Sequence, residues 1–358
     1  MNPVTRSILR FTMHALLTAL PVVLPAVAVY IATDPFKVIR IYDCYLPDPG
    51  DNPIRVGINK GVVTLDSYLR NTAEHPSRPI NAMIFGSSIS CYYDVDEWAS
   101  ILRAYYGDSI PIRPMHFDSS GETLRSLARK VTYLAKRDAL PDYALIIFDP
   151  LILKREVDDS PFAIDPPAFN PGVVNFVKFH YTFFRAATNA DFLKSMIYAD
   201  ITGRPDNIGH NPIFESQPIV YDRYLNQESI PQWDSIIAAD PEQFYYAHPL
   251  IAPTDTVTVS APVLTETKIK ALTTIAQNFS DCSTDCRIII SPNRRGVSLS
   301  PADLRILQNL FGADRVFDFS ASHAHYLRTD SLLYDNTHYR SPFASLLMRS
   351  AYPTSKSH

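Results

Sequence analysis

The spacing of hydrophobic positions changes several times along this chain of 358 residues. The first long apolar run is N-terminal, and residues 11–32 contain no charged side chain if His14 is neutral. About 20 apolar residues suffice to span a bilayer as a helix, and prolines such as Pro21 and Pro25 are tolerated as kinks in membrane helices. We therefore expect a short cytoplasmic tail at 1–10 and a transmembrane anchor at 11–32.

A cleaved signal peptide is the alternative for this segment, because the small residues of Ala26-Val27-Ala28 suit a signal peptidase. An uncleaved anchor is favoured because the apolar run continues to Ala32. Two arginines precede the run and two basic residues follow it, so positive charge barely discriminates the orientation. The short tail makes a cytoplasmic N-terminus the default. Either interpretation then places the rest of the chain outside the cytoplasmic membrane, as a single-pass or exported protein.

After a connector at 33–78, short apolar runs alternate with segments in which apolar residues recur every three or four positions. The first kind is typical of buried strands and the second of amphipathic helices. Their alternation predicts a parallel sheet with helices on both faces. The expected strands lie at 79–85, 111–117, 144–148, 287–290 and 316–319, and the expected helices begin near residues 95, 124, 264, 301 and 341.

The alternation stops between residues 151 and 262, a stretch rich in proline, tyrosine, phenylalanine and asparagine. Its aromatic content argues against disorder. We expect an insertion at about 151–262 that lies over the carboxyl edge of the sheet, where ligands bind in such folds, with some helix near 174–198. The predicted domain at 79–358 is thus a three-layer, doubly wound α/β fold with a large middle insertion.

Composition narrows the possible functions. A net charge of −4 with 20% charged residues gives no electrostatic reason to expect nucleic acid as a partner. The four cysteines of an exported chain permit disulfides, and Cys282 and Cys286 can close a small loop. Cys91 is expected to be a buried thiol. No second Cys or His pair stands at zinc spacing, so we expect no metal site.

Two short motifs carry the candidate chemistry. Gly86-Ser87-Ser88 follows the first expected strand, and Asp335-Asn336-Thr337-His338 precedes the last expected helix. Together they offer Ser88 as a nucleophile, His338 as its general base and Asp335 to orient the histidine. Each motif alone also fits an ordinary role, because Gly and Ser are common turn residues and an Asp–His pair is common in solvated loops.

Other candidates follow the expected strands at the same edge of the sheet. The backbone N–H groups of Ser88 and Gly121 can stabilise an oxyanion, and Asn293 can add a side-chain amide. Asp149 is a candidate for substrate binding, or a turn residue before a proline. Arg340 can hold an anionic substrate or remain solvated.

These motifs together resemble those of the SGNH, or GDSL-type, hydrolase superfamily. Gly86-Ser87-Ser88 is similar to the first conserved block of that superfamily, with Ser87 where Asp is usual. Gly121 is positioned like the second block, and the segment from Asp335 to His338 is similar to the last. In place of the third block, Gly-x-Asn-Asp, this chain has Phe148-Asp149-Pro150. The resemblance covers roughly 79–347 outside the insertion and implies an acyl-serine intermediate without a cofactor.

With the anchor included, the chain also resembles membrane-anchored SGNH proteins of bacterial envelope polysaccharide modification, which work beside membrane-bound O-acyltransferases. The resemblance implies an acyl esterase or O-acyltransferase that passes an acyl group through Ser88 to a polysaccharide hydroxyl or to water. One alternative is a catalytically weak or inactive carbohydrate-binding or assembly protein, which the altered third block motivates. A lipid-directed esterase is a third possibility.

Overall fold

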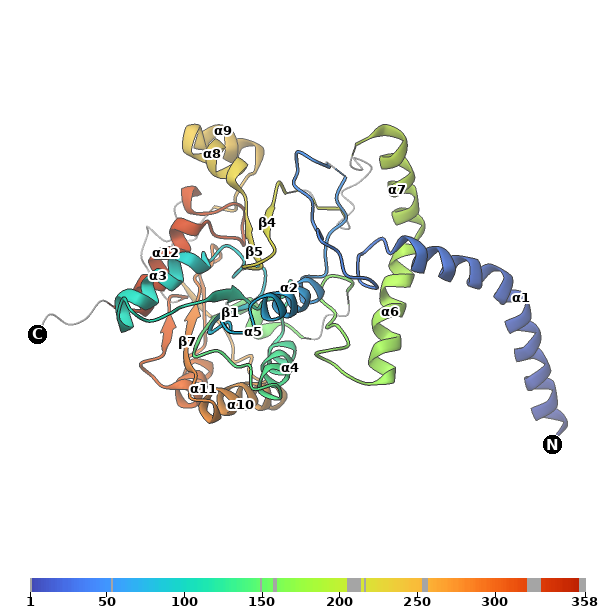
Figure 1. Ribbon diagram of the computed structural model, residues 1–358, viewed down its shortest axis with the longest axis horizontal. Coiled ribbons are helices and arrows are strands. Elements are labelled where there is room, and N and C mark those ends of the chain that lie inside the picture. The colour runs from blue at the N-terminus through green and yellow to red at the C-terminus, as the bar shows by residue number, and fades with distance from the viewer. Residues whose placement is uncertain are drawn as a thin grey trace, which may run out of the picture.

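The computed structural model describes residues 2–52, 54–148, 150–156, 160–204, 214–215, 217–252, 257–320 and 330–353. Its centre is a sheet of five parallel strands in the order β2-β1-β3-β7-β9 (Figure 1). The strands are β1 Ala82–Gly86, β2 Pro114–His116, β3 Tyr143–Phe148, β7 Asp285–Ile290 and β9 Val316–Asp318.

The inner strands are apolar on both faces. Every residue of β1 is buried, and so is every residue of β3 and β7 after the first. Such continuous apolar runs are typical of parallel sheets covered by helices on both sides. The sequence prediction of buried parallel strands in these places is therefore confirmed.

Helices form a layer on each side of the sheet (Figure 1). On one side are α3 (Val95–Tyr106) and α12 (Ser341–Ala351), and on the other are α4 (Leu124–Ala135), α10 (Glu266–Asp281) and α11 (Pro301–Phe311). The strand order reverses direction at β1, whose neighbours are β2 and β3. In open α/β sheets, ligands bind outside the carboxyl ends of the strands beside such a reversal, which is where β1 leads into Ser88.

The connector expected at 33–78 contains a helix that the sequence analysis missed, α2 (Lys60–Glu74). Asn59 caps it, its side chain accepting from Val62 N at 2.9 Å. Its buried face is largely polar and includes Lys60, Thr64, Ser67 and Asn71. A helix that buries polar groups lacks the apolar periodicity on which the prediction depended.

Between β3 and α10 the described chain adds no strand to the central sheet. The helix expected near 174–198 is present as two helices, separated at Thr188 and Asn189. The elements of this stretch are α5 Pro150–Lys154, α6 Val173–Ala187, α7 Ala190–Thr202, the antiparallel pair β4 Val220–Asp222 and β5 Gln227–Ser229, α8 Pro231–Ala239, α9 Pro241–Ala247 and β6 Thr258–Val259, which pairs with β8 Val297–Ser298.

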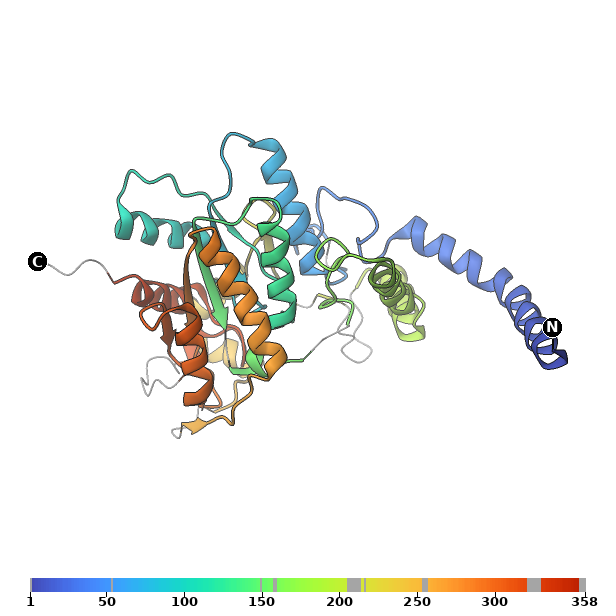
Figure 2. The ribbon, with the colours of Figure 1, turned by 90° about the horizontal axis from the view of Figure 1, so that it is seen from below.

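The N-terminal helix α1 (Pro3–Thr33) projects away from the body and is long and apolar enough to cross a membrane (Figures 1 and 2). It begins near the start of the chain, so the expected tail at 1–10 is largely helical. Only 6% of its most apolar window is buried. Most of its apolar surface therefore has no protein partner within the described chain, and only its last turns contact the body, where Tyr30 is buried.

The four cysteines carry free thiols. Cys282 is exposed at the end of α10, whereas Cys286 is buried within β7. The two side chains thus lie in different environments, and the small disulfide loop considered from the sequence is not formed. Cys91 is buried, as the sequence predicted.

Candidate functional site

Ser88 lies in a tight turn that follows β1. Within this turn Ser90 N and Ser90 Oγ both donate to Ser87 O, at 2.8 and 2.7 Å, and Cys91 Sγ donates to Ser88 O at 2.6 Å. The next helix, α3, begins only at Val95, with Asp94 as its cap. Ser88 therefore lies in a turn and not at the N-terminus of a helix.

Gly86 allows this turn to pack closely on the sheet. A Cβ atom at this position would lie 2.7 Å from Ser90 Oγ and 3.0 Å from the backbone oxygen of Ile147. Both distances are shorter than ordinary van der Waals contact. The glycine is needed here for space, and a side chain would push the Ser88 turn away from β3.

Asp335 and His338 form a hydrogen-bonded pair in the loop before α12. His338 Nδ1 lies 2.7 Å from Asp335 Oδ2, while Asp335 Oδ1 accepts from the backbone N–H groups of Thr337 and His338 at 2.7 and 2.8 Å. Partial burial by itself would raise the pKa of Asp335, but these hydrogen bonds and the His338 charge hold the pKa below its usual value. An ionised carboxylate therefore faces Nδ1 and leaves Nε2 as the proton acceptor.

The loop that carries His338 is fixed on both flanks. Tyr334 N donates to His338 O at 2.9 Å, and Tyr339 Oη donates to Pro292 O at 2.6 Å. The ring of Tyr339 also stacks on Phe343 of α12, with centroids 4.0 Å apart. These contacts hold His338 at the carboxyl edge of β7, beside the residues that follow that strand.

Tyr92 connects the two candidate motifs. It lies four residues after Ser88, and its ring packs edge-on against His338 with centroids 5.9 Å apart. Ser341 Oγ donates to Tyr92 O at 3.1 Å. The Ser88 turn and the Asp335–His338 loop are therefore neighbours, although among the described residues neither Ser88 Oγ nor His338 Nε2 has a hydrogen-bond partner. Catalytic hydrogen bonds are often long or absent before substrate binds.

Gly121 lies in the loop that follows β2, next to the Ser88 turn. Ser119 N donates to Gly86 O at 3.2 Å, which ties this loop to the end of β1. Gly121 adopts a positive φ of 67°. Within the described chain the backbone N–H groups of Ser88 and Gly121 have no acceptor, so both remain available to an anionic oxygen.

The remaining sequence candidates have other roles or fall outside the description. The Asn293 side chain closes its own loop, with Nδ2 donating to Val297 O at 2.7 Å and Oδ1 accepting from Val297 N at 3.1 Å. Arg340 bonds Asp234 of α8 through Nε at 2.8 Å and Ser331 O through Nη1 at 2.6 Å. Both side chains therefore hold loops together. Asp149 lies outside the described residues.

Glu215 is a neighbour of His338 that the sequence analysis missed. Burial raises the pKa of Glu215, while the charge of His338 acts in the opposite direction. Nearby, Tyr92 Oη donates to Gln217 Oε1 at 3.1 Å. This segment is joined to the connector by Glu215 N, which donates to Arg55 O at 2.8 Å. No motif marks Glu215, because its position depends on a contact between two irregular segments.

A buried polar cluster, formed by Lys60, Asp118, Tyr221, Asn226 and Glu228, lies beneath the Ser88 turn. Lys60 Nζ bonds Glu228 Oε1 at 2.9 Å and Asn226 O at 3.1 Å. Asn226 Nδ2 in turn donates to Asp118 Oδ1 at 3.2 Å, and Tyr221 Oη donates to Asn226 Oδ1 at 2.8 Å. The cluster thus joins α2, the β4–β5 hairpin and the loop after β2.

The charges of the polar cluster stabilise each other. Burial by itself would raise the pKa of Glu228, but the charge of Lys60 and its hydrogen bond outweigh this effect and lower the pKa. Burial raises the pKa of Cys91 well above its usual value, and the charges of Glu228 and Asp118 raise it further. Cys91 is therefore a protonated thiol that supports the turn, and it is a poor second nucleophile.

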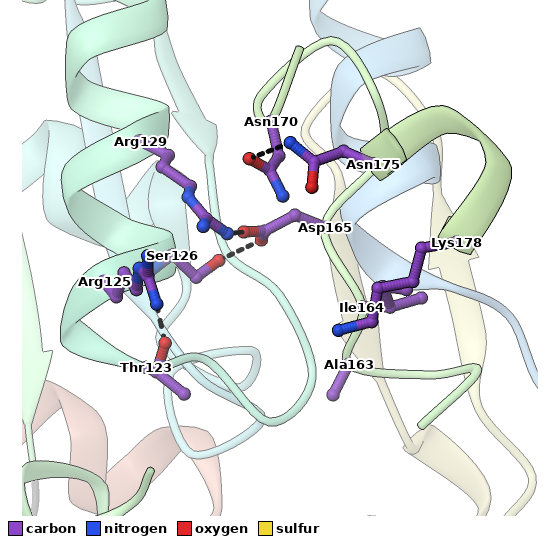
Figure 3. Close-up of a pocket in the computed structure, with 10 residues that line it drawn as sticks. All are labelled: Thr123, Arg125, Ser126, Arg129, Ala163, Ile164, Asp165, Asn170, Asn175 and Lys178. Carbon is purple, nitrogen blue, oxygen red and sulfur yellow. Dashed lines mark hydrogen bonds and ion pairs between the residues drawn. The ribbon is translucent and has the colours of Figure 1, made fainter. Parts of the chain in front are cut away.

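A separate hollow of about 210 Å³ lies between α4 and α6 (Figure 3). Asp165 projects into it and bonds Arg129 Nη1 at 2.7 Å, and it also accepts from Ser126. Asn175 of α6 bonds Asn170 Oδ1 at 3.0 Å across the same space. None of the candidate residues named from the sequence lines this hollow. It lies where α6 is attached to the body, and we call this region the joint.

No protein-family model matches this chain, and no curated protein matches it significantly.

Proposed function

We propose that this protein is a membrane-anchored, exported serine acyl esterase or O-acyltransferase of SGNH type that acts on a cell-envelope polysaccharide. The observation that carries the proposal is the Asp335–His338 hydrogen bond of 2.7 Å, located beside the Ser88 turn through Tyr92. The position of Ser88 after β1, next to the reversal of strand order, supports it.

In the proposed reaction, Ser88 Oγ attacks the carbonyl carbon of an acyl ester, and its proton moves to His338 Nε2. The backbone N–H groups of Ser88 and Gly121 stabilise the oxyanion. The leaving alcohol takes the proton from His338 as the ester C–O bond breaks, which leaves an acyl-serine. A polysaccharide hydroxyl or water then attacks the acyl-serine and gives its proton to His338. The bond between the acyl carbon and Ser88 Oγ breaks, and His338 returns the proton to Oγ while Asp335 holds the histidine tautomer.

The proposed location is the bacterial inner membrane. The helix α1 would span it once, with the α/β domain on the periplasmic side, where the polysaccharide lies. A membrane-bound O-acyltransferase is the proposed partner that supplies the acyl group. The length and apolar character of α1 support the anchor, and the resemblance of the motifs supports the partner.

The proposal can be tested by treating the full chain in detergent with a fluorophosphonate and mapping the adduct by mass spectrometry. We expect one adduct, on Ser88, that is absent in Ser88→Ala and His338→Ala. Asp335→Asn should slow its formation by orders of magnitude, because the histidine tautomer is no longer fixed. Ser87→Ala is the matched control and should react normally. An adduct that persists in the folded His338→Ala protein would refute the assignment of the base.

The second candidate is a non-catalytic carbohydrate-binding or assembly protein with the same fold. It is favoured by the altered third block and by the Asn293 amide, which bonds Val297 in its own loop. This candidate predicts that no adduct forms on folded protein and that glycan binding is unchanged in Ser88→Ala.

A further inference from the structure

The helices α6 and α7 expose apolar stripes. In each helix three apolar residues spaced four apart are exposed, while a different face packs inward. Val173 on α6 and Ile201 on α7 are 79% and 78% exposed. Single exposed apolar residues are ordinary, but a contiguous patch marks an interaction site. We call the following residues the apolar stripes: Val173, Val177 and Tyr181 of α6, and Leu193, Ile197 and Ile201 of α7.

The end of α1 covers part of the same face of α6. The ring of Tyr30 in α1 packs edge-on against Phe184, with centroids 5.8 Å apart. Phe184 lies seven residues, or two helical turns, after Val177. Just beyond α1, Phe36 stacks on Phe192 of α7, with centroids 5.2 Å apart. The α6 stripe therefore continues from the contact with α1, whereas the contact of Phe36 with Phe192 lies on the inward face of α7.

The orientation of these helices suits a membrane surface. In Figure 1, α6 and α7 form a column, and the part of α1 next to the body leaves this column crosswise before the N-terminal part of α1 bends toward the direction of the column. Figure 2 shows the column end-on while α1 extends sideways. If the part of α1 next to the body runs along the membrane normal, α6 and α7 lie roughly parallel to the membrane plane. An amphipathic helix in that orientation buries its apolar face at the boundary between headgroups and acyl chains.

The charges beside the stripes agree with this placement. α6 contains no acidic residue, and its exposed Arg185 lies on one flank of the stripe, whereas Lys178 lines the hollow between α4 and α6. Long basic side chains reach lipid headgroups while their stems stay in apolar surroundings. α7 carries exposed Asp191 and Asp200 together with Lys194. The α6 stripe should therefore enter the boundary more deeply than the α7 stripe.

The joint shown in Figure 3 fixes α6 to the body. Asn175 in the first turn of α6 bonds Asn170, and Asp165 in the same loop bonds Arg129 of α4. At its other end α6 is held by α1 through Phe184. A membrane contact along α6 would consequently set the orientation of the whole α/β domain.

We propose that the apolar stripes of α6 and α7 lie in the boundary between headgroups and acyl chains of the membrane that α1 spans. This rests on the proposed anchoring by α1, and it is independent of the chemistry at Ser88. The contact would hold the domain, with its candidate site, at a fixed angle to the lipid surface.

The test uses the full chain in lipid nanodiscs whose acyl chains carry bromine, a short-range quencher of tryptophan fluorescence. Tryptophan is introduced by Val177→Trp and Ile197→Trp, and the signal of native Trp98 and Trp233 is subtracted with the unsubstituted protein. Tyr246→Trp on α9, where Tyr246 is 91% exposed, is the matched surface control. Leu17→Trp within α1 reports whether the anchor itself is inserted.

We expect strong quenching for Leu17→Trp and Val177→Trp, weaker but clear quenching for Ile197→Trp, and none for Tyr246→Trp. If Leu17→Trp is quenched while Val177→Trp and Ile197→Trp resemble Tyr246→Trp, the inference is wrong, and a membrane protein rather than lipid would be the occupant to seek. If Leu17→Trp is not quenched, both the anchor and the inference fail. Ser88→Ala should change none of these signals, which separates this test from that of the proposed activity.

Discussion

The central sheet and the polar cluster beneath the Ser88 turn are both buried, but different forces hold them. In β1, β3 and β7 the buried side chains are almost all apolar, so stabilisation grows with the apolar area removed from water and has no strong directional requirement. In the polar cluster, Lys60 and Glu228 are stabilised by each other and by aligned hydrogen bonds. Small side-chain substitutions should therefore destabilise the sheet less than they destabilise the cluster.

The largest expected effect follows from breaking the ion pair of the cluster. Lys60→Met keeps the length of the side chain but leaves Glu228 charged and unpaired, which costs about 3–5 kcal/mol for a buried pair. The free energy of unfolding is measured by urea denaturation of the full chain in detergent. Lys60→Met/Glu228→Gln, which removes both charges, should recover more than half of the loss. Equal losses in the single and double variants would show that the pair contributes no mutual stabilisation.

The same contrast explains how much of the fold was predictable. The strands β1, β3 and β7 stand out in the sequence because each buries a continuous apolar run. Helix α2 does not, because its inward face carries Lys60 and other polar residues whose partners, such as Asn226 and Glu228, lie far along the chain. A local apolar pattern therefore indicates a helix or strand only when the side chains that it buries are apolar.

The candidate site likewise has one part that the sequence predicts and another part that it does not. Asp335 and His338 are three residues apart, so their hydrogen bond is local and follows from the motif. The proximity of this loop to the Ser88 turn depends on strand order and on Tyr92, neither of which a single sequence specifies. Glu215 belongs to an irregular segment, and no pattern of residue types predicts that it lies near His338.

A second buried ion pair extends the comparison, because its contribution to stability depends on pH. Lys130 Nζ bonds Glu122 Oε2 at 2.5 Å, but Glu122 Oε1 has no hydrogen-bond partner among the described residues. Burial raises the pKa of Glu122 to about 7, despite the opposing charge of Lys130. Glu122 thus binds its proton more tightly in the folded state than in the unfolded state. Its contribution to the stability of the fold is fully present below the pKa of the unfolded state and is lost as the pH rises to about 7.

We expect the stability difference between wild type and Glu122→Gln to change by on the order of 3 kcal/mol between pH 4.5 and 8, with the variant relatively more stable at the higher pH. Urea denaturation across this range measures it. Taking the difference between the two proteins cancels the titration of all other groups. A constant difference would mean that Glu122 ionises normally in the folded protein.

The close packing of the Ser88 turn on the sheet is expected to be the next most sensitive feature. Gly86→Ala places a Cβ atom 2.7 Å from Ser90 Oγ and 3.0 Å from Ile147 O, which should cost about 1–3 kcal/mol, as overpacking does. It should also slow the fluorophosphonate reaction, because the turn must move. The control is Gly50→Ala, where no atom lies within 4 Å. If both variants unfold at the same urea concentration, the turn is looser than its contacts indicate.

The smallest effect should come from the sheet itself. Ile146 lies at the centre of β3 with no exposed surface, and Ile146→Val removes one methylene while keeping a β-branched residue suited to a strand. The expected cost is about 0.5–1.5 kcal/mol, well below that of Lys60→Met, although Ile146 is buried more deeply within apolar surroundings. Urea denaturation of both variants under the same conditions decides the comparison. If Ile146→Val lowers the free energy of unfolding as much as Lys60→Met does, side-chain shape rather than the pairing of charges determines how sensitive both regions are to substitution.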